Sequence, residues 1–367
     1  MRTERAGAEL VIDLDAIAAN WRALRDRVAP GVGSAAVVKA DAYGLGVGPV
    51  ARALAAAGCT AFFVATPDEG AALRRVVPEA TILVLHGVPP RAEGFLARHR
   101  LVPVVNDLGE LERWRRRAAT AGGGDAVLHL DTGLNRLGIP PEDSQRLIDR
   151  PELVRGLRVT WMSHLACADE PGHPMNAEQL RRFRVLLGRL PAGPATLAAS
   201  AGVLLGPAYH FDLVRPGYAL YGGNPVAGAP AMRPVVRLSA RILQVRRVDT
   251  PGSVGYGAAH RVTGARNIAT VPVGYADGFL RSLGGRGSAV IDGWRAPVVG
   301  RISMDLTTID VSGIPSERAR PGAVVELIGE TRTVEAVATD AGTIGYEILT
   351  ALGRRYPRHY VGGTVAA

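Results

Sequence analysis

An apolar run meets a glycine-punctuated loop in the segment Val37-Val38-Lys39-Ala40-Asp41-Ala42-Tyr43-Gly44-Leu45-Gly46. Short apolar runs rich in β-branched residues predict buried strands, and glycines mark the turns that end them. An amphipathic stretch at 47–57 follows directly. The segment therefore predicts a strand, a loop and a helix, which together form a βα unit of a parallel sheet.

The same alternation continues through the first two-thirds of the chain. Candidate strands lie at 35–40, 60–66, 81–86, 102–106, 126–130, 159–164, 196–200 and 211–215. Helix-like segments between them include 47–57, 67–77, 108–119 and 176–190. Eight such units predict an α/β fold, a (β/α)8 TIM-like barrel, whose chemistry lies at the C-terminal ends of the strands. Lys39, His164, Ser200 and Arg215 all fall at such ends.

The last third of the chain has a different texture. Valine-rich runs at 289–291 and 324–328 are separated by glycines and prolines, and helical stretches are few before 333–352. This pattern predicts a second, mostly β domain. We expect a barrel domain at 1–230 and a C-terminal β-rich domain at 231–367.

Composition narrows the class of protein. The first ten residues carry four charges, and no stretch of about 18 residues is free of charges and glycines, so we expect no signal peptide and no membrane span. Cys59 and Cys167 lack metal-type spacing, and we expect no metal and a reducing cytoplasm. The net charge of +9 comes from scattered arginines without interleaved aromatics, so we expect no nucleic-acid partner.

One basic residue stands apart from the rest. Of the 43 lysines and arginines only Lys39 is a lysine. Arginine stays protonated in proteins, whereas lysine can lose its proton and attack a carbonyl to form a Schiff base. Burial also lowers the pKa of a lysine toward that of a nucleophilic amine. Lys39 is therefore a candidate for covalent catalysis.

The segment around Lys39 resembles the cofactor-lysine motif of the alanine racemase family. Further matches follow in the family's order at 131–138, 163–170, 211–222, 255–257, 273–278 and 299–305. The resemblance implies a barrel that holds pyridoxal 5′-phosphate (PLP) on Lys39. It also implies an isomerase that interconverts L- and D-alanine and supplies D-alanine for cell-wall peptidoglycan.

The resemblance assigns the cofactor site residue by residue. Ser200, Tyr43 and the backbone amides of Gly217 and Tyr218 would hold the phosphate, since the loops after strands seven and eight often bind phosphate in this barrel. Arg215 would face the pyridine nitrogen and keep it unprotonated. The ring is then a weaker electron sink, which suits removal and return of the α-proton.

Racemisation needs one base on each face of the substrate carbon. The resemblance gives these roles to Lys39 and to Tyr256, which lies in the second domain. A free tyrosine titrates near about pH 10, so it needs help to act near neutrality. His164 and, behind it, Arg215 would supply that help.

The remaining family positions concern the substrate and a second subunit. Arg136 would steady the substrate carboxylate or its neighbours, and Tyr275, Met304 and Asp305 match positions that shape the entrance and the carboxylate site. In the family these C-terminal residues and Tyr256 reach into the partner's site. A homodimer follows by resemblance.

Three positions depart from the family pattern. His129 stands where many relatives carry a lysine that is modified to a carbamate, so no carbamate forms there. Ala199 precedes Ser200 where many relatives have asparagine, and Arg354 aligns with a phosphate-binding tyrosine of some relatives.

Three other functions share part of this sequence pattern. A serine or broad-specificity amino-acid racemase fits the same motifs, because the sequence does not give the volume of the substrate pocket. A PLP-dependent decarboxylase would use a glutamate toward the pyridine nitrogen and a late cysteine; Arg215 and the lack of any cysteine after Cys167 argue against it. A non-catalytic PLP carrier would need only the barrel, and the second domain with Tyr256 argues against it.

Overall fold

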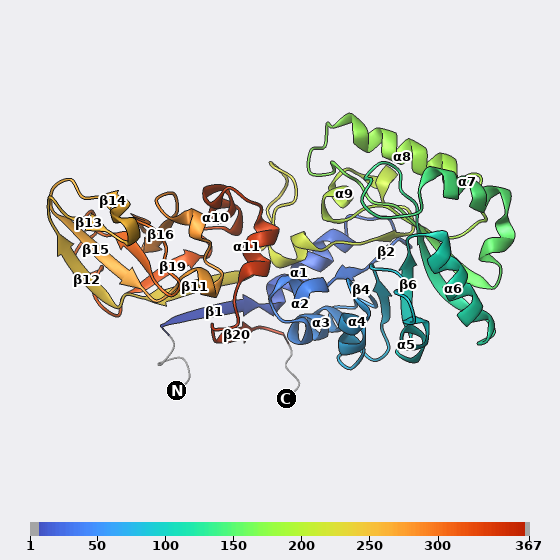
Figure 1. The fold of residues 1–367 in the computed structure, drawn as a ribbon, viewed down its shortest axis with the longest axis horizontal. Helices are drawn as coiled ribbons and strands as arrows, with labels where there is room; N and C mark the ends of the chain where they lie inside the picture. The colour runs from blue at the N-terminus through green and yellow to red at the C-terminus, as the bar shows by residue number, and fades with distance from the viewer. Residues whose placement is uncertain (1–6, 364–367) are drawn as a thin grey trace.

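The computed structural model describes residues 7–363 as two lobes that meet at a narrower waist (Figure 1). The larger lobe contains the elements from α1 to α9, and the smaller lobe is built mostly from strands of the last third of the chain. Within residues 7–363, no helix combines the length and the apolar character that crossing a membrane requires.

The larger lobe is organised around a parallel sheet. Seven strands follow one another in sequence order: β3 (Ala36–Val37), β4 (Ala61–Val64), β5 (Thr81–Val84), β6 (Leu101–Val105), β7 (Gly124–His129), β8 (Leu157–Met162) and β9 (Ala195–Thr196). The eighth strand, β10 (Leu213–Val214), pairs in parallel with β2 (Gly33–Ser34), which leads into β3. On its other side the Arg215 amide donates to the Ala198 carbonyl beyond β9. The sheet closes on itself, which confirms the predicted barrel.

The barrel interior is apolar. Its central cluster consists of residues from successive strands: Ala35, Phe63, Leu83, Val104, Val127 and Met162. A parallel sheet covered by helices is buried on both faces, so its strands are nearly continuous hydrophobic runs. This is why apolar runs alone locate the strands.

Helices surround the barrel: α1 (Leu14–Arg25), α3 (Val47–Ala56), α4 (Pro67–Arg74), α5 (Glu93–Arg98), α6 (Leu108–Ala119), α7 (Pro141–Asp149) and α8 (Pro174–Leu187). Two short segments, α2 (Lys39–Tyr43) and α9 (Ser200–Leu204), lie instead at the C-terminal ends of strands. The helix starts follow local rules, as where Asp107 caps α6 and Thr66 with Glu69 forms a capping box on α4. α6 has its predicted bounds, whereas α4 and α8 end earlier than predicted, at Arg74 and Leu187.

The smaller lobe is mostly β, as predicted. A six-stranded sheet has the order β17-β16-β19-β11-β1-β20 and lies near a three-stranded sheet, β12-β15-β18, and a hairpin, β13-β14. The strands are β11 (Val236–Arg241), β12 (Gln244–Val248), β13 (Ser253–Val254), β14 (His260–Arg261), β15 (Arg266–Val271), β16 (Ser288–Ile291), β17 (Trp294–Pro297), β18 (Thr307–Asp310) and β19 (Val324–Ile328). The helical stretch predicted at 333–352 forms α10 (Val334–Ala341) and α11 (Gly345–Ala351).

The start of the chain departs from the expected division at residue 230. β1 (Ala8–Asp13) lies in the six-stranded sheet of the smaller lobe, antiparallel to β11 and parallel to β20 (Arg358–Val361). Its Leu10 and Ile12 are fully buried. The alternating burial of β1 is typical of a strand with one face in the core. Its place in this sheet depends on its partners, β11 and β20, which lie far away in the sequence.

Candidate active site

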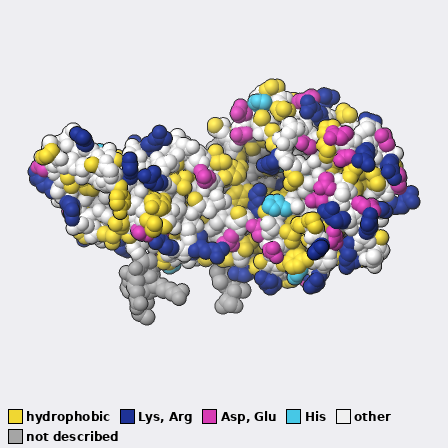
Figure 2. Space-filling view, in the orientation of Figure 1, with side chains coloured by type: hydrophobic (Ala, Val, Ile, Leu, Met, Phe, Trp, Pro, Cys, Tyr) yellow, Lys and Arg dark blue, Asp and Glu magenta, His cyan; other side chains and the backbone are white. Residues whose placement is uncertain are grey.

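A cavity of about 1060 Å³ lies at the C-terminal ends of the barrel strands. The surface is hollowed between the two lobes, with hydrophobic, basic and histidine side chains around the hollow (Figure 2). Eight of the predicted site residues line the cavity together: Lys39, Tyr43, Arg136, His164, Ser200, Arg215, Gly217 and Tyr218.

Lys39 is held on an unusual piece of backbone. The four residues after it, Ala40 to Tyr43, all have φ between 54° and 56°. This left-handed conformation costs about 1–2 kcal/mol per residue for side chains with a Cβ, so surrounding contacts must hold it. Asp41 supplies one such contact, because its carboxylate accepts a hydrogen bond from the Val47 amide at 2.8 Å. Backbone strain of this kind is concentrated at functional sites.

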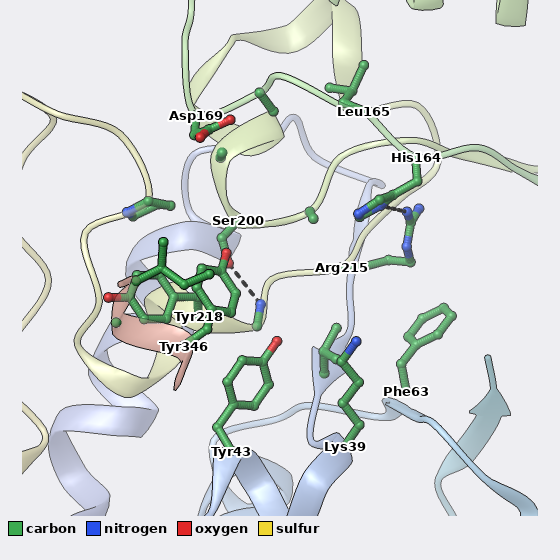
Figure 3. Close-up of a pocket in the computed structure, with 18 of the residues that line it drawn as sticks. Lys39, Tyr43, Phe63, His164, Leu165, Asp169, Ser200, Arg215, Tyr218 and Tyr346 are labelled. Carbon is green, nitrogen blue, oxygen red and sulfur yellow. Dashed lines mark hydrogen bonds between the residues drawn. The ribbon is translucent and has the colours of Figure 1, made fainter. Parts of the chain in front are cut away.

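The Lys39 amine points into the cavity (Figure 3). Burial lowers its pKa, the positive charge of Arg136 lowers it further, and the negative charge of Glu69 acts in the opposite direction. A larger share of the amine is therefore neutral than for a free lysine. A neutral amine is the form that attacks a carbonyl or accepts a proton.

Arg215 forms the buried floor of the cavity. Its guanidinium donates to the Thr196 hydroxyl at 2.6 Å, to the Ser163 carbonyl at 2.9 Å and to Nδ1 of His164 at 3.3 Å. Burial lowers its pKa to about 10, so it keeps its charge near neutral pH. The site thus holds a permanent cation without a carboxylate partner among these contacts.

His164 is a neutral imidazole with a defined proton position. Its pKa is lowered to about 3, first by burial and then by the charges of Arg215 and Arg136. Arginine can only donate, so Nδ1 of His164 accepts from Arg215 (Figure 3). The proton of the neutral ring is therefore on Nε2.

A cluster of hydroxyl and amide groups lies at another part of the cavity. The Ser200 hydroxyl accepts hydrogen bonds from the amides of Gly217 at 2.9 Å and Ala219 at 3.3 Å. The Tyr43 hydroxyl points toward the same place (Figure 3), and a Cβ on residue 217 would lie 2.5 Å from its oxygen. Only glycine leaves room for this approach. Burial raises the pKa of Tyr43, so its hydroxyl stays a donor.

Tyr346 is a cavity residue that the sequence analysis missed. It lies in α11, and its ring stacks on Tyr218 with centroids 4.1 Å apart and planes at 15°. Burial raises its pKa to about 12. A tyrosine beside Gly345, at the start of a helix in an otherwise β-rich domain, was the available signal.

Arg354, which the sequence analysis aligned with a phosphate-binding tyrosine of some relatives, does not line the cavity. The side chain of Arg354 is 89% exposed and lies 3.9 Å from Asp41, whereas Tyr346 is the tyrosine that faces the cavity. Tyr346 lies in the first turn of α11, whereas Arg354 follows the end of that helix. Ala199, another departure, lines the cavity.

His129, at the end of β7, has a fixed partner instead of a carbamate. Its Nδ1 lies 3.0 Å from Oδ1 of Asn106, and the Asn106 amide nitrogen donates to the carbonyls of Leu85 and Val104. The asparagine oxygen therefore faces the ring, and Nδ1 of His129 donates. Burial, followed by the charge of Arg215, lowers the pKa of His129 to about 4.

The predicted residues of the second domain lie outside this cavity in the described part of the chain. Tyr256 is 72% exposed, Tyr275 43% and Met304 54%. Asp305 is also exposed, and it pairs with Arg355 at 2.7 Å. The structure therefore does not bring these residues to Lys39 within one chain.

These exposed residues nevertheless belong to one connected unit, the three-loop cluster, which comprises residues 255–258, 274–278 and 300–306. The amide of Tyr275 donates to the Ser303 carbonyl, and the amide of Ala276 donates to the Met304 carbonyl. A Cβ on Gly255 would lie 3.3 Å from the backbone of Arg301. The cluster presents its tyrosines and Met304 from a linked backbone.

Comparisons with known proteins agree along the whole chain. The model of the alanine racemase N-terminal domain matches residues 12–225, and that of the alanine racemase C-terminal domain matches residues 235–360. The chain belongs to the alanine racemase family. An alanine racemase of Rhodospirillum rubrum is 52% identical over 363 residues, which cover 98% of this chain and 97% of the relative.

Solved alanine racemases have the same fold. The structure from Bartonella henselae, described with covalently bound pyridoxal phosphate, has a TM-score of 0.94 and 39% identity and covers 97% of this chain and 100% of its own. The structure from Streptomyces coelicolor has a TM-score of 0.91 and 39% identity and covers 99% and 100%.

The cavity of this alanine racemase family member fits PLP, the cofactor of the family. Lys39 offers the amine for a covalent bond, and Arg215 offers a buried cation for a ring nitrogen. Ser200, the amide of Gly217 and the Tyr43 hydroxyl converge on one spot. Convergent N–H and O–H donors are the usual surroundings of a phosphate.

Proposed function

We propose that this racemase uses two opposed bases on alanine, Lys39 of one copy and Tyr256 of a second copy. The proposal rests on the separation of these two residues in one chain. Lys39, the only lysine, faces the barrel cavity, whereas Tyr256 is exposed on the other lobe. When bound, PLP supplies an electron sink that acidifies the α-proton of the amino acid.

Lys39 removes or returns the α-proton on one face of the substrate. Its Nζ must be neutral to accept that proton, and burial together with Arg136 lowers its pKa in this direction. By the family's assignment this face is that of D-alanine.

Tyr256 of the second copy handles the proton of L-alanine at its hydroxyl oxygen. Nε2 of His164 carries a proton, because Nδ1 accepts from Arg215. That N–H donates to the tyrosine oxygen and stabilises it while it is deprotonated. Arg215 in turn holds the imidazole and adds a fixed positive charge.

The cavity wall would hold the cofactor rigidly. Ser200, the Gly217 amide, Tyr43 and Tyr346 would donate to the phosphate; the amide of Tyr218 belongs to the same loop. Arg215 would face the pyridine nitrogen as a cation and keep it unprotonated. A weaker electron sink favours return of the proton over transamination.

The substrate is a small amino acid whose carboxylate would bind Arg136. This residue is carried by the loop after β7, where the Asp131 carboxylate accepts hydrogen bonds from the amides of Gly133 and Leu134 at 2.9 and 3.0 Å. The D-alanine formed would supply cell-wall peptidoglycan. We place the enzyme in the cytoplasm, which suits the free thiols of both cysteines.

A head-to-tail homodimer would complete each site. The three-loop cluster exposes Tyr256, Tyr275 and Met304 on one lobe, and the cavity opens beside the other. In this arrangement each copy gives its cluster, including Asp305, to the cavity of its partner and receives the partner's cluster in return.

Mixing two inactive variants tests the proposal. Lys39→Ala and Tyr256→Phe subunits are each inactive as homodimers, but a mixed dimer has one site with both bases. A chiral assay on L-alanine should therefore recover part of the wild-type activity after subunit exchange. The same assay with a panel of other L-amino acids, including L-serine, tests the range of substrates.

The matched control mixes Lys39→Ala with the double variant Lys39→Ala, Tyr256→Phe, which should recover nothing. If exchange is demonstrated and the first mixture stays inactive, the two bases do not come from different chains.

A further inference from the structure

Lys39 lies where the first two barrel strands diverge. The residue before it, Val38, donates its amide to the carbonyl of Phe63 in β4 at 2.9 Å. The residue after it, Ala40, has already entered the left-handed segment, with φ of 54°. The backbone ladder between β3 and β4 therefore ends at Lys39.

Glu69 continues this connection with its side chain. One carboxylate oxygen accepts from the Ala40 amide at 2.8 Å, and the other accepts from the Ala65 amide at 2.7 Å. Ala65 is itself fixed to the next strand, because its carbonyl accepts from the His86 amide at 2.9 Å. One carboxylate thus ties the backbone beyond Lys39 to a rigid point of the barrel.

The same residue has an ordinary local role. Glu69 is the third residue of α4 and forms a capping box with Thr66, whose hydroxyl accepts from the Glu69 amide at 3.2 Å. A capping box requires only contacts within the first turn of a helix. The bond to Ala40 joins residues far apart in the sequence, and capping does not explain it.

We propose that Glu69 is a positioning residue for Lys39: its bridging carboxylate holds the left-handed segment in place and thereby aims the lysine amine into the cavity. Both neighbours of Lys39 are then anchored to the end of β4, Val38 by the backbone and Ala40 by Glu69. The part of this inference that concerns catalysis rests on the proposed function.

The charge of Glu69 gives the proposal a second consequence. Its carboxylate acts against burial and against the Arg136 charge, which both lower the pKa of Lys39. His164 also lies within electrostatic reach of the amine and is neutral. Replacing the carboxylate by an amide should therefore lower the pKa of Lys39.

Two variants separate positioning from capping. Glu69→Gln keeps the length of the side chain but has only one acceptor oxygen, so it cannot accept from both Ala40 and Ala65, and one side of the bridge is lost. Thr66→Ala removes the other half of the capping box and leaves the bridge intact. We expect kcat to fall about tenfold or more in Glu69→Gln, since misplacing a reacting group by about 1 Å can cost up to about 10²-fold. Thr66→Ala should retain kcat within about twofold.

The pKa of Lys39 can be measured without cofactor or turnover. Because Lys39 is the only lysine, a chain labelled with ¹³C at lysine Cε has one such resonance, and its titration reports this amine alone. In apoprotein we expect a lower pKa in Glu69→Gln than in the wild type and no change in Thr66→Ala.

Equal kcat losses in the two variants, or an unchanged Lys39 titration in Glu69→Gln, would overturn the proposal and leave Glu69 as a helix cap. An inactive wild type would instead refute the proposed function. The titration would still show whether Glu69 acts on Lys39.

Discussion

The barrel cavity and the three-loop cluster differ in how completely their functional side chains are buried and hydrogen-bonded within one chain. In the cavity, Arg215 and Ser200 are buried, and each has hydrogen bonds to fixed backbone or side-chain atoms. In the cluster, Tyr256 and Tyr275 are exposed, although their loops are tied together. The cavity is thus pre-organised within one chain, whereas the tyrosines of the cluster are exposed.

This difference matters for the chemistry of the two bases. Within one copy, burial and the charge of Arg136 already lower the pKa of Lys39. Tyr256 lies far from any such environment in its own chain and would acquire one only beside the His164 of a second copy.

Removing the amine from the cavity should have the largest effect. Lys39→Arg keeps a cation but cannot form the covalent bond to the cofactor, so we expect no measurable racemisation. After borohydride reduction, peptide mapping should find the pyridoxyl label on the Lys39 peptide of the wild type and on no peptide of the variant. Label on another wild-type peptide would contradict the assignment.

Removing the hydroxyl from the cluster should be less severe. Tyr256→Phe keeps the ring, and loss of a general base costs about 10²–10⁴-fold. Racemisation should fall in both directions, because the reaction is reversible. In deuterated solvent, D-alanine should still exchange its α-proton through Lys39, while L-alanine should scarcely exchange.

Tyr209→Phe, at a tyrosine outside the cavity and the cluster, serves as the control and should behave as the wild type. Similar residual exchange of both enantiomers in Tyr256→Phe would show that Tyr256 is not the L-face base.

The buried hydrogen bonds of Arg215 should contribute more to the free energy of unfolding than an exposed ion pair does. Arg215→Gln leaves the Ser163 carbonyl and His164 without their donor, and we expect a loss of about 3 kcal/mol in the free energy of unfolding. Arg158→Gln breaks a two-pronged ion pair with Asp125 whose side chains are 77% and 47% exposed, and its effect should be much smaller because solvent screens an exposed pair. Urea unfolding measures both. Equal losses would mean that Arg215 is no better anchored than a surface arginine.

Acidification below about pH 6.5 should lower the free energy of unfolding, because two cavity histidines are buried in the neutral state. In the unfolded chain both histidines bind protons below about pH 6.5, whereas the folded pKa is about 4 for His129 and about 3 for His164. The unfolded state therefore binds more protons as the pH falls from about 6.5 toward 4, and the free energy of unfolding decreases in that range. We expect His129→Asn to reduce this loss by about 3 kcal/mol at pH 4. Parallel curves for variant and wild type would contradict the buried, neutral state of His129.

The sequence located most of the cavity for a simple reason. Strands of a parallel barrel are local apolar runs, and their C-terminal ends share one face of the fold. Lys39, His164, Ser200 and Arg215 therefore come together once the runs are recognised. The pattern also separates the α/β part from the mostly β part, since periodicity changes along the chain.

Other features follow only from contacts between distant segments. The structure shows that Glu69, which caps α4 together with Thr66, also reaches Ala40 with the same carboxylate. The sequence shows a tyrosine in a late helix, but not that Tyr346 stacks on Tyr218 in the cavity while Arg354 turns to solvent.

By itself, the sequence determined the barrel, the chemistry of its single lysine and the strand ends that carry its partners, because each depends on residue type and short-range periodicity. Tertiary structure alone decided the sheet that β1 joins, the identity of Tyr346 and the separation of Tyr256 from Lys39. These depend on which distant surfaces pack together. That choice is set by the summed burial and hydrogen bonding of the whole fold rather than by any local pattern.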